Sequence, residues 1–320
     1  MSLYPLIFQP TFHYRIWGGN KLRSFGKNIT EENIGESWEI STVPGFVSVV
    51  SNGDLKGADL NELVAKYKDK LVGGKVYQYY GDKFPLLIKF LDAATPLSVQ
   101  VHPDDEYAGK HHNSFGKTEM WYVLDTEPDS EVILGFKKNV DESVFSENIE
   151  KNTVESVLRK VHPERGDVIY IPSGRVHAMG KGLSVVEIQQ TSDITYRIYD
   201  YDRVDKDGKK RELHLQQAKE VSDFSFIEQP FTPYDKKAEE AVVIKSPYFT
   251  VSRMVLNGNK KLQDSPQSFR ILICVEGSCV IDGTPPVRIA KGQSLLLPAG
   301  LKNIELKPEE ETILLEVHIE

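Results

Sequence analysis

The chain has 320 residues, a formal net charge of −8 and a pI near 5.6. An acidic chain repels nucleic acid and anionic lipid, so we expect neither as a partner, whereas a small anion needs only one local basic patch. No apolar run is long enough to cross a bilayer, and the first ten residues lack the pattern of a secretory signal, so the sequence predicts a cytoplasmic protein with no membrane contact.

Short apolar runs bounded by Gly, Pro, Asp or Asn dominate the chain, which is typical of antiparallel strands. They lie at 47–50, 86–91, 97–101, 120–124, 132–134, 168–171 and 185–188, and strands resume at Val242. Three segments have helical apolar spacing instead, at 60–71, 144–157 and 215–221. A Pro- and charge-rich stretch from about Glu228 to Glu240 is interpreted as a connector. The chain is therefore expected to be mainly β, with a few short decorating helices.

An internal repeat divides the chain. The segment 166–174, GDVIYIPSG, is matched by 292–300, GQSLLLPAG, and 120–125, MWYVLD, by 271–276, ILICVE. Two matches in the same order favour two related β-sandwiches over a chance similarity of hairpin edges. We expect a first domain at 1–235 and a second at 236–320.

Four potential metal ligands lie in the first half of the chain. Gln100 and His102 stand two apart in a strand-like run, so their side chains project from the same face. Glu119 begins the next strong strand, and His177 follows Pro172 where the chain leaves a strand. Two imidazoles, a carboxylate and an amide oxygen suit Zn²⁺ better than Mg²⁺ or copper(I). A single histidine is usually not a ligand, and we expect His111 and His112 in a solvated loop.

The repeat supports this set by contrast. Aligned on their prolines, the repeated segments place Asn303 where His177 stands, and the upstream match places Arg270 where Glu119 stands. An arginine cannot ligate a cation, so we expect the second domain to lack metal ligands.

The two cysteines, Cys274 and Cys279, flank a turn-like segment, and a tight hairpin would bring them opposite each other. In a reducing compartment we expect two buried thiols rather than a disulfide.

Several motifs resemble the class I, zinc-dependent mannose-6-phosphate isomerases in their short bacterial form, members of the cupin superfamily. The segment PLLIKFLDA at 85–93, followed by LSVQVHP at 97–103, resembles the family's signature. GKTEMW at 116–121, IPSGRVHA at 171–178 and SDITYRIYD at 192–200 resemble its other site segments. The resemblance extends from the amino terminus to about Arg203, and the second domain matches only in outline.

The resemblance implies two cupin-type jelly-roll barrels and an interconversion of mannose 6-phosphate and fructose 6-phosphate through an enediol. It implies one zinc ion per chain on Gln100, His102, Glu119 and His177, with Lys117 and Arg197 lining a sugar-phosphate pocket. It leaves the oligomeric state open.

The chemistry needs a base near C1 and C2 and positive charge beside the oxygen that gains charge. Arg197 presents a rigid cationic fork that could stabilise the enediolate or bind the phosphate, although an ion pair with Asp200 or Asp202 is the commoner fate of such an arginine. Lys117, Asp193 or a metal-bound water could be the base, and the sequence does not choose among them.

Two other functions remain open. Cupin barrels also support non-haem metal dioxygenases, which need no cationic pocket, and other cupin-type sugar-phosphate isomerases. Arg197 and Lys117 around an anionic pocket argue against a dioxygenase. The two-barrel length and the signature at 85–103 favour mannose-6-phosphate isomerase over another sugar-phosphate isomerase.

Overall fold

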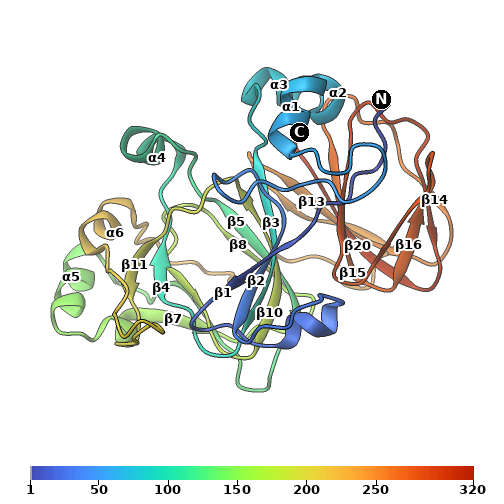
Figure 1. Ribbon diagram of the computed structural model, residues 1–320. Coiled ribbons are helices and arrows are strands. Elements are labelled where there is room, and N and C mark those ends of the chain that lie inside the picture. The colour runs from blue at the N-terminus through green and yellow to red at the C-terminus, as the bar shows by residue number, and fades with distance from the viewer. Residues whose placement is uncertain (1) are drawn as a thin grey trace.

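The computed structural model describes residues 2–320 and consists of two β-sandwiches placed side by side (Figure 1). Strands β1 to β11 build the first sandwich from a six-stranded sheet, β1-β2-β3-β10-β5-β8, and a five-stranded sheet, β11-β4-β9-β6-β7. Their bounds are Thr11–Tyr14, Ile34–Ile40, Leu86–Ala93, Val99–Val101, Glu119–Asp125, Val132–Phe136, Leu158–Val161, Val168–Ile171, His177–Met179, Leu183–Gln190 and Tyr196–Tyr199.

Strands β12 to β20 build the second sandwich, which is coloured orange to red in Figure 1. A five-stranded sheet, β12-β13-β20-β15-β18, faces a four-stranded sheet, β14-β19-β16-β17. The bounds are Glu240–Lys245, Thr250–Leu256, Lys260–Lys261, Arg270–Glu276, Ser278–Ile281, Val287–Ala290, Ser294–Leu297, Glu305–Pro308 and Thr312–His318. Antiparallel pairing joins every pair of neighbouring strands. The prediction of a mainly β chain with two related sandwiches is confirmed.

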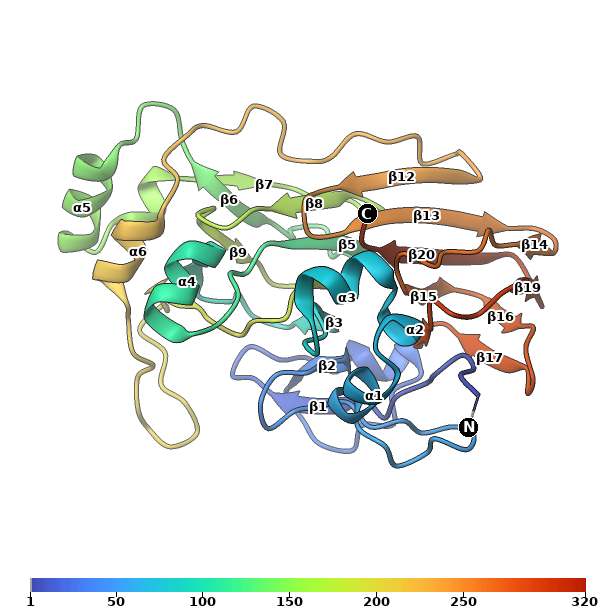
Figure 2. The same cartoon turned by 90° about the horizontal axis from the view of Figure 1, so that it is seen from above.

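Short helices decorate the edges of the sheets, as Figure 2 shows from above. They are η1 Lys21–Phe25, α1 Leu60–Tyr67, α2 Asp69–Val72, α3 Gly74–Tyr80, α4 Asp105–His112, α5 Glu142–Glu150, η2 Val154–Val157 and α6 Leu215–Val221. The predicted helix at 60–71 begins after its Asp59 cap but breaks at Lys68, where φ is 49°. The predicted helix at 144–157 is likewise divided, into α5 and η2, whereas α6 matches its prediction.

Two details of the expected elements are wrong. His111 and His112 lie in the last turn of α4 rather than in a loop. The run 47–50 forms only isolated bridges, Val49 with Asp59 and Val50 with Phe8, because it crosses the edge of the first sandwich rather than joining a sheet.

The repeat seen in the sequence reappears as strand pairing. The repeated segments contain β8 and β18, each at the edge of its sheet, and each pairs with the strand of the upstream match, β5 or β15. Glu119 lies opposite Ile171, and Arg270 lies opposite Leu297. Each of these partners immediately precedes the proline on which the repeat was aligned, so Glu119 and Arg270 occupy equivalent positions.

Alternate residues of the six-stranded sheet face two different cores, as the period of two in a strand requires. Leu91, Trp121 and Val185 pack inside the first sandwich. Their neighbours Phe90 and Val186 belong to the largest apolar cluster, which also contains buried residues of β12, β13, β15 and β20. This cluster joins the two sandwiches. Glu119 has the same parity as Trp121 and therefore faces the interior of the first sandwich.

Cys274 and Cys279 are free and buried, which confirms the predicted thiols. The predicted hairpin is wrong, because β15 and β16 belong to different sheets. Gly277, with φ of 73°, turns the chain from one sheet to the other, and a side chain there would collide with the Glu311 carbonyl.

Within residues 2–320, none of the helices is long and apolar enough to cross a membrane.

Candidate metal centre and neighbouring cavity

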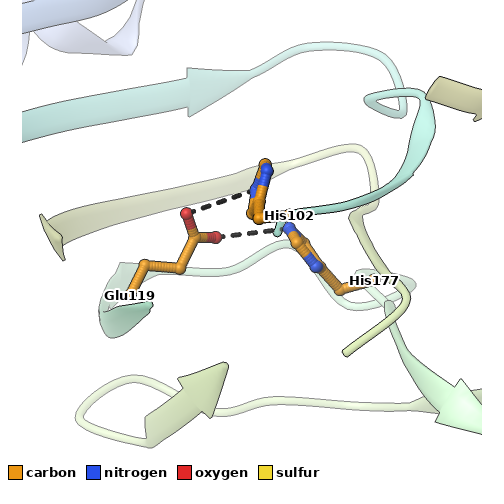
Figure 3. A group of neighbouring side chains, drawn as sticks. All are labelled: His102, Glu119 and His177. Carbon is orange, nitrogen blue, oxygen red and sulfur yellow. Dashed lines mark ion pairs between the residues drawn. The ribbon is translucent and has the colours of Figure 1, made fainter. Parts of the chain in front are cut away.

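The four predicted ligands come from both sheets of the first sandwich. Gln100 lies in β4 and pairs directly with His177, the first residue of β9, while His102 follows β4 by one residue. Glu119 is the first residue of β5 in the facing sheet. Figure 3 shows the Glu119 carboxylate facing both imidazole rings, with one oxygen toward each. Strands far apart in the sequence therefore bring this set together.

Three of these residues form a tight, fully enclosed group. Glu119 and His177 are 0% exposed and His102 is 1% exposed. The Nε2 atom of His102 lies 3.5 Å from Glu119 Oε2, and Nε2 of His177 lies 3.3 Å from Glu119 Oε1. One ligand atom from each residue lies within 4.8 Å of the others, which suits a single metal ion.

Hydrogen bonds fix the orientation of both rings. His102 Nδ1 donates to the carbonyl of Ile194 at 2.8 Å, and His177 Nδ1 donates to the carbonyl of Arg175 at 2.8 Å. Since a carbonyl can only accept, each Nδ1 carries a proton, and each ring turns Nε2, the nitrogen left to bind a metal, toward Glu119. Metal-binding histidines usually have this arrangement.

The group is electrostatically incomplete without a cation. Glu119 Oε1 is buried and accepts no hydrogen bond. The atom that faces it is Nε2 of His177. Burial alone would raise the pKa of Glu119, but Lys117 and His102 outweigh it and hold that pKa well below its usual range. Burial, reinforced by Lys117, holds the pKa of His102 well below its usual range. A carboxylate and two lone pairs in one enclosed space fit a divalent ion such as zinc.

Gln100 is in place as the fourth member. Its side-chain nitrogen lies 3.3 Å from His177 Nε2. Oxygen and nitrogen of an amide exchange places by a half-turn about χ3, so the oxygen can take this position. Gln100 also borders the cavity described below, whereas His102, Glu119 and His177 lie behind its wall.

Lys117 lies against this group and is only 4% exposed. Its ammonium is 3.0 Å from His102 Nε2 and forms an ion pair with Glu119. Burial would lower the pKa of Lys117, but Glu119 and Glu187 outweigh it and raise the pKa above its usual value. The amine therefore holds its proton here, which is opposite to the lowered pKa that a basic lysine needs.

A cavity of about 510 Å³ opens in front of the group. Its lining includes all three predicted catalytic residues, Lys117, Asp193 and Arg197. Lys89, Arg15 and Arg211 add further positive charge, balanced in part by Glu36, Glu187 and Asp205. The cavity is thus large enough for a small polar ligand and has cations on several sides.

Arg197 lies in β11 directly opposite Gln100, so it neighbours the proposed ligands across the sheet. Its guanidinium donates to the Glu212 carbonyl at 2.9 Å and to Ser98 Oγ at 3.3 Å. Within residues 2–320 it forms no ion pair, and burial together with Arg211 lowers its pKa. A cation with only neutral partners beside a cavity can accept an anionic ligand.

The alternative pairing of Arg197 with a nearby aspartate is absent from the described chain. Asp200 pairs with Arg203 and Arg211, and Asp202 pairs with Lys210. Asp193, the other candidate base, is exposed and borders the cavity.

Sequence reasoning missed a buried row of side chains across the six-stranded sheet, of which Trp38, Lys89 and Glu187 line the cavity. Trp38, Lys89, Glu187 and Trp121 lie opposite one another across β2, β3, β10 and β5. Lys89 donates to Glu187 at 2.9 Å, and the Trp121 indole donates to the other oxygen of Glu187, also at 2.9 Å. The sequence held one signal, because Lys89 is the only charge in the run 86–91 and Glu187 the only charge in the run 185–188.

The second sandwich has no comparable group. His102, Glu119 and His177 are the only cluster of three or more His, Cys, Asp or Glu within metal-binding distance in residues 2–320. At the equivalent position, Arg270 forms an ion pair with Glu316.

Comparisons with known proteins agree with this geometry. Residues 6–138 match a family model described as phosphomannose isomerase type I, catalytic domain, and residues 238–317 match one for the mannose-6-phosphate isomerase cupin domain. The chain is 41% identical over 318 residues to mannose-6-phosphate isomerase ManA of Bacillus subtilis, covering 98% of this chain and 99% of the relative. It is 38% identical over 315 residues to mannose-6-phosphate isomerase of Streptococcus mutans, covering 97% of each.

A solved structure agrees with these sequence matches. The crystal structure of mannose 6-phosphate isomerase from Bacillus subtilis superposes with a TM-score of 0.88 at 35% identity, covering 98% of this chain and 99% of that one. The chain thus shares both sequence, over nearly its whole length, and fold with mannose-6-phosphate isomerases. The chain therefore belongs to the type I mannose-6-phosphate isomerases, with a cupin fold.

Proposed function

We propose that this chain interconverts mannose 6-phosphate and fructose 6-phosphate at a zinc site in its first sandwich. The observation that carries the proposal is the buried group of His102, Glu119 and His177 behind a cavity that Arg197 enters without a carboxylate partner. Full-length identity to mannose-6-phosphate isomerases supports the choice of substrate.

We assign one zinc ion per chain to Gln100, His102, Glu119 and His177. The two lone pairs, the unpartnered Glu119 oxygen and the amide of Gln100 support this assignment. When bound, zinc supplies a Lewis acid beside the sugar oxygens that gain charge during isomerisation.

The residues of the chain would bind and orient the substrate. Arg197 offers guanidinium N–H groups to an anionic oxygen, either of the enediolate or of the phosphate. The charged ammonium of Lys117 suits donation to a developing oxyanion, whereas Asp193 offers a carboxylate that can accept a proton at the cavity. Of the two, Asp193 is therefore the group that can accept a proton without first losing one.

The pKa of Lys117 depends on the carboxylate that zinc would also use. Glu119 is the strongest influence holding this pKa up. A metal ion sharing Glu119 would weaken that influence and add a second positive charge nearby, both of which lower the pKa of a lysine. Lys117 consequently remains a candidate base for the zinc-loaded protein.

We further propose that residues 1–235 form the catalytic domain and 236–320 a second domain without metal ligands. This division follows the sheets, since β1 to β11 and β12 to β20 do not exchange strands. A small sugar phosphate is the proposed partner. A cytoplasmic location stays a prediction of the sequence.

A coupled assay of mannose 6-phosphate conversion tests the function. The purified protein is assayed as isolated, after treatment with a chelator, and after zinc is added back. We expect activity to fall on chelation and to return with zinc. If the zinc-loaded protein converts no mannose 6-phosphate, the substrate assignment fails, and other aldose phosphates are the next candidates.

A further inference from the structure

The segment Gly116–Glu119 carries two of the residues at the proposed site, since Lys117 and Glu119 lie on either side of Thr118. Lys117 and Glu119 are connected to the metal group through their side chains. Their positions depend on the backbone of residues 116–118, which lies outside any strand until β5 begins at Glu119.

Two side chains, Asp105 and Gln190, accept hydrogen bonds from the backbone of this segment. Asp105 Oδ1 accepts from the Gly116 N–H at 2.8 Å and from Gln190 Nε2 at 2.9 Å. Gln190 Oε1 in turn accepts from the Thr118 N–H at 2.8 Å. Asp105 and Gln190 thus form a continuous clamp that fixes the two peptide N–H groups flanking Lys117.

The clamp is tightly packed as well as hydrogen-bonded. A side chain on Gly116 would come within 2.5 Å of the Asp104 carbonyl carbon and 2.6 Å of the Asp105 nitrogen. The segment therefore rests directly on the first turn of α4. Gln190 is buried, so replacing it would leave the Thr118 N–H without a hydrogen-bond acceptor and out of reach of water.

Neither clamp residue reaches the metal group itself. Gln190 is the last residue of β10, Asp105 is the first of α4, and neither borders the cavity of about 510 Å³. Asp105 instead borders a second cavity, together with Tyr248 from the loop between β12 and β13. The clamp therefore lies between the metal site and the second sandwich.

We propose that Asp105 and Gln190 are positioning residues that hold Gly116–Glu119 in the geometry required for metal binding and turnover. They act through the backbone and do not touch substrate. The proposal deepens the proposed function and rests on it, because it presumes that Glu119 is a metal ligand. Outer partners that orient metal ligands typically contribute about 10- to 100-fold to metal affinity or activity.

Asp105 offers the cleaner test because it is partly exposed, so its replacement does not open the core. Asp105→Ala removes the two hydrogen bonds that Asp105 Oδ1 accepts, from Gly116 and from Gln190. Asp105→Asn is the conservative variant, because one amide oxygen can replace Oδ1 and accept from both Gly116 and Gln190. Glu106→Ala is the matched control, since it removes a carboxylate from the same first turn of α4 without touching residues 116–119.

Zinc affinity, measured by competition with a chromophoric chelator, is the primary readout, and kcat, KM and thermal unfolding are recorded alongside. We expect Asp105→Ala to weaken zinc binding about 10- to 100-fold and to lower kcat more than it changes KM. Asp105→Asn should restore both to within about threefold of wild type, and Glu106→Ala should leave them unchanged.

The proposal is overturned if Asp105→Ala binds zinc and turns over like wild type. It is equally overturned if Glu106→Ala shows the same losses, which would indicate a general effect of charge at α4, or if Asp105→Asn fails to restore them. Failure of the proposed function gives a different result, because wild type itself would then bind no zinc at this site or convert no mannose 6-phosphate.

Discussion

The two sandwiches have the same strand order but carry side chains of opposite charge, Glu119 and Arg270, at equivalent positions. In the first, the order β3-β10-β5-β8 places Glu119 beside a cavity of about 510 Å³. In the second, β13-β20-β15-β18 places Arg270 beside a cavity of about 10 Å³, which holds at most about one water molecule. One architecture therefore supports either an open site with a carboxylate oxygen that accepts no hydrogen bond, or a closed site in which an ion pair takes the place of the candidate metal ligands.

The largest expected effect comes from removing a ligand. His102→Ala should abolish zinc binding and reduce turnover by more than the roughly 100-fold typical of losing a partner of a ligand. Zinc content by elemental analysis and the coupled assay measure both. His111→Ala, on the exposed side of α4, is the matched histidine control. Full activity in His102→Ala would remove His102 from the site.

The next largest effect distinguishes an arginine of the first sandwich from one of the second. Arg197→Lys should keep zinc but lose about 10- to 100-fold in kcat, because lysine lacks the planar fork that binds an anion through two N–H groups. Arg270→Lys should keep both zinc and turnover, since a lysine can still pair with Glu316. Steady-state kinetics of the two variants test this contrast. Normal turnover in Arg197→Lys would exclude a catalytic role for the guanidinium.

Removing the second arginine altogether should affect stability rather than chemistry. Arg270→Ala leaves Glu316 largely buried without its partner, and we expect the free energy of unfolding to fall by about 2 kcal/mol. Denaturant titration measures this loss, and the coupled assay on the folded variant should match wild type. A loss of zinc without a loss of stability would contradict the structural role.

The smallest effect concerns His13 at the cavity of the first sandwich. Burial and the neighbouring Arg15 lower its pKa to about 4, against about 6.5 in the unfolded chain. The unfolded state therefore binds the proton more tightly, and His13 reduces stability as pH falls from about 6.5 to 4. Between pH 7 and pH 5 we expect a loss of about 1–2 kcal/mol that His13→Gln abolishes. Denaturant titrations at the two pH values give the difference, and an equal pH dependence in both proteins would exclude His13 as its source.

Features of the site that depend on spacing within one strand, or on the internal repeat, could be predicted from the sequence. The i, i+2 spacing of Gln100 and His102 placed both on one face, and the repeat identified Arg270 as the counterpart of Glu119. Register across strands could not be predicted in the same way. Lys89 and Glu187 are 98 residues apart, and only the pairing of β3 with β10 shows that they meet.

Backbone turns account for the other differences. The left-handed conformation of Lys68 divides α1 from α2, although nothing in the apolar spacing of that segment marks a break. Helix α4 was missed because its surface is mostly polar and only Ala108 is fully buried. Its start at the Asp104 cap is nevertheless what places Asp105 beneath Gly116.

The position of β20 has a consequence for synthesis of the protein. Residues 312–318 come after every other strand in chain order, yet β20 lies between β13 and β15 in the middle of its sheet. Until β20 emerges from the ribosome, that sheet lacks a central strand and cannot cover the apolar face of β3, β10 and β5. The nascent chain therefore exposes this apolar face until β20 has been synthesised, and chaperones should bind it most strongly during that interval.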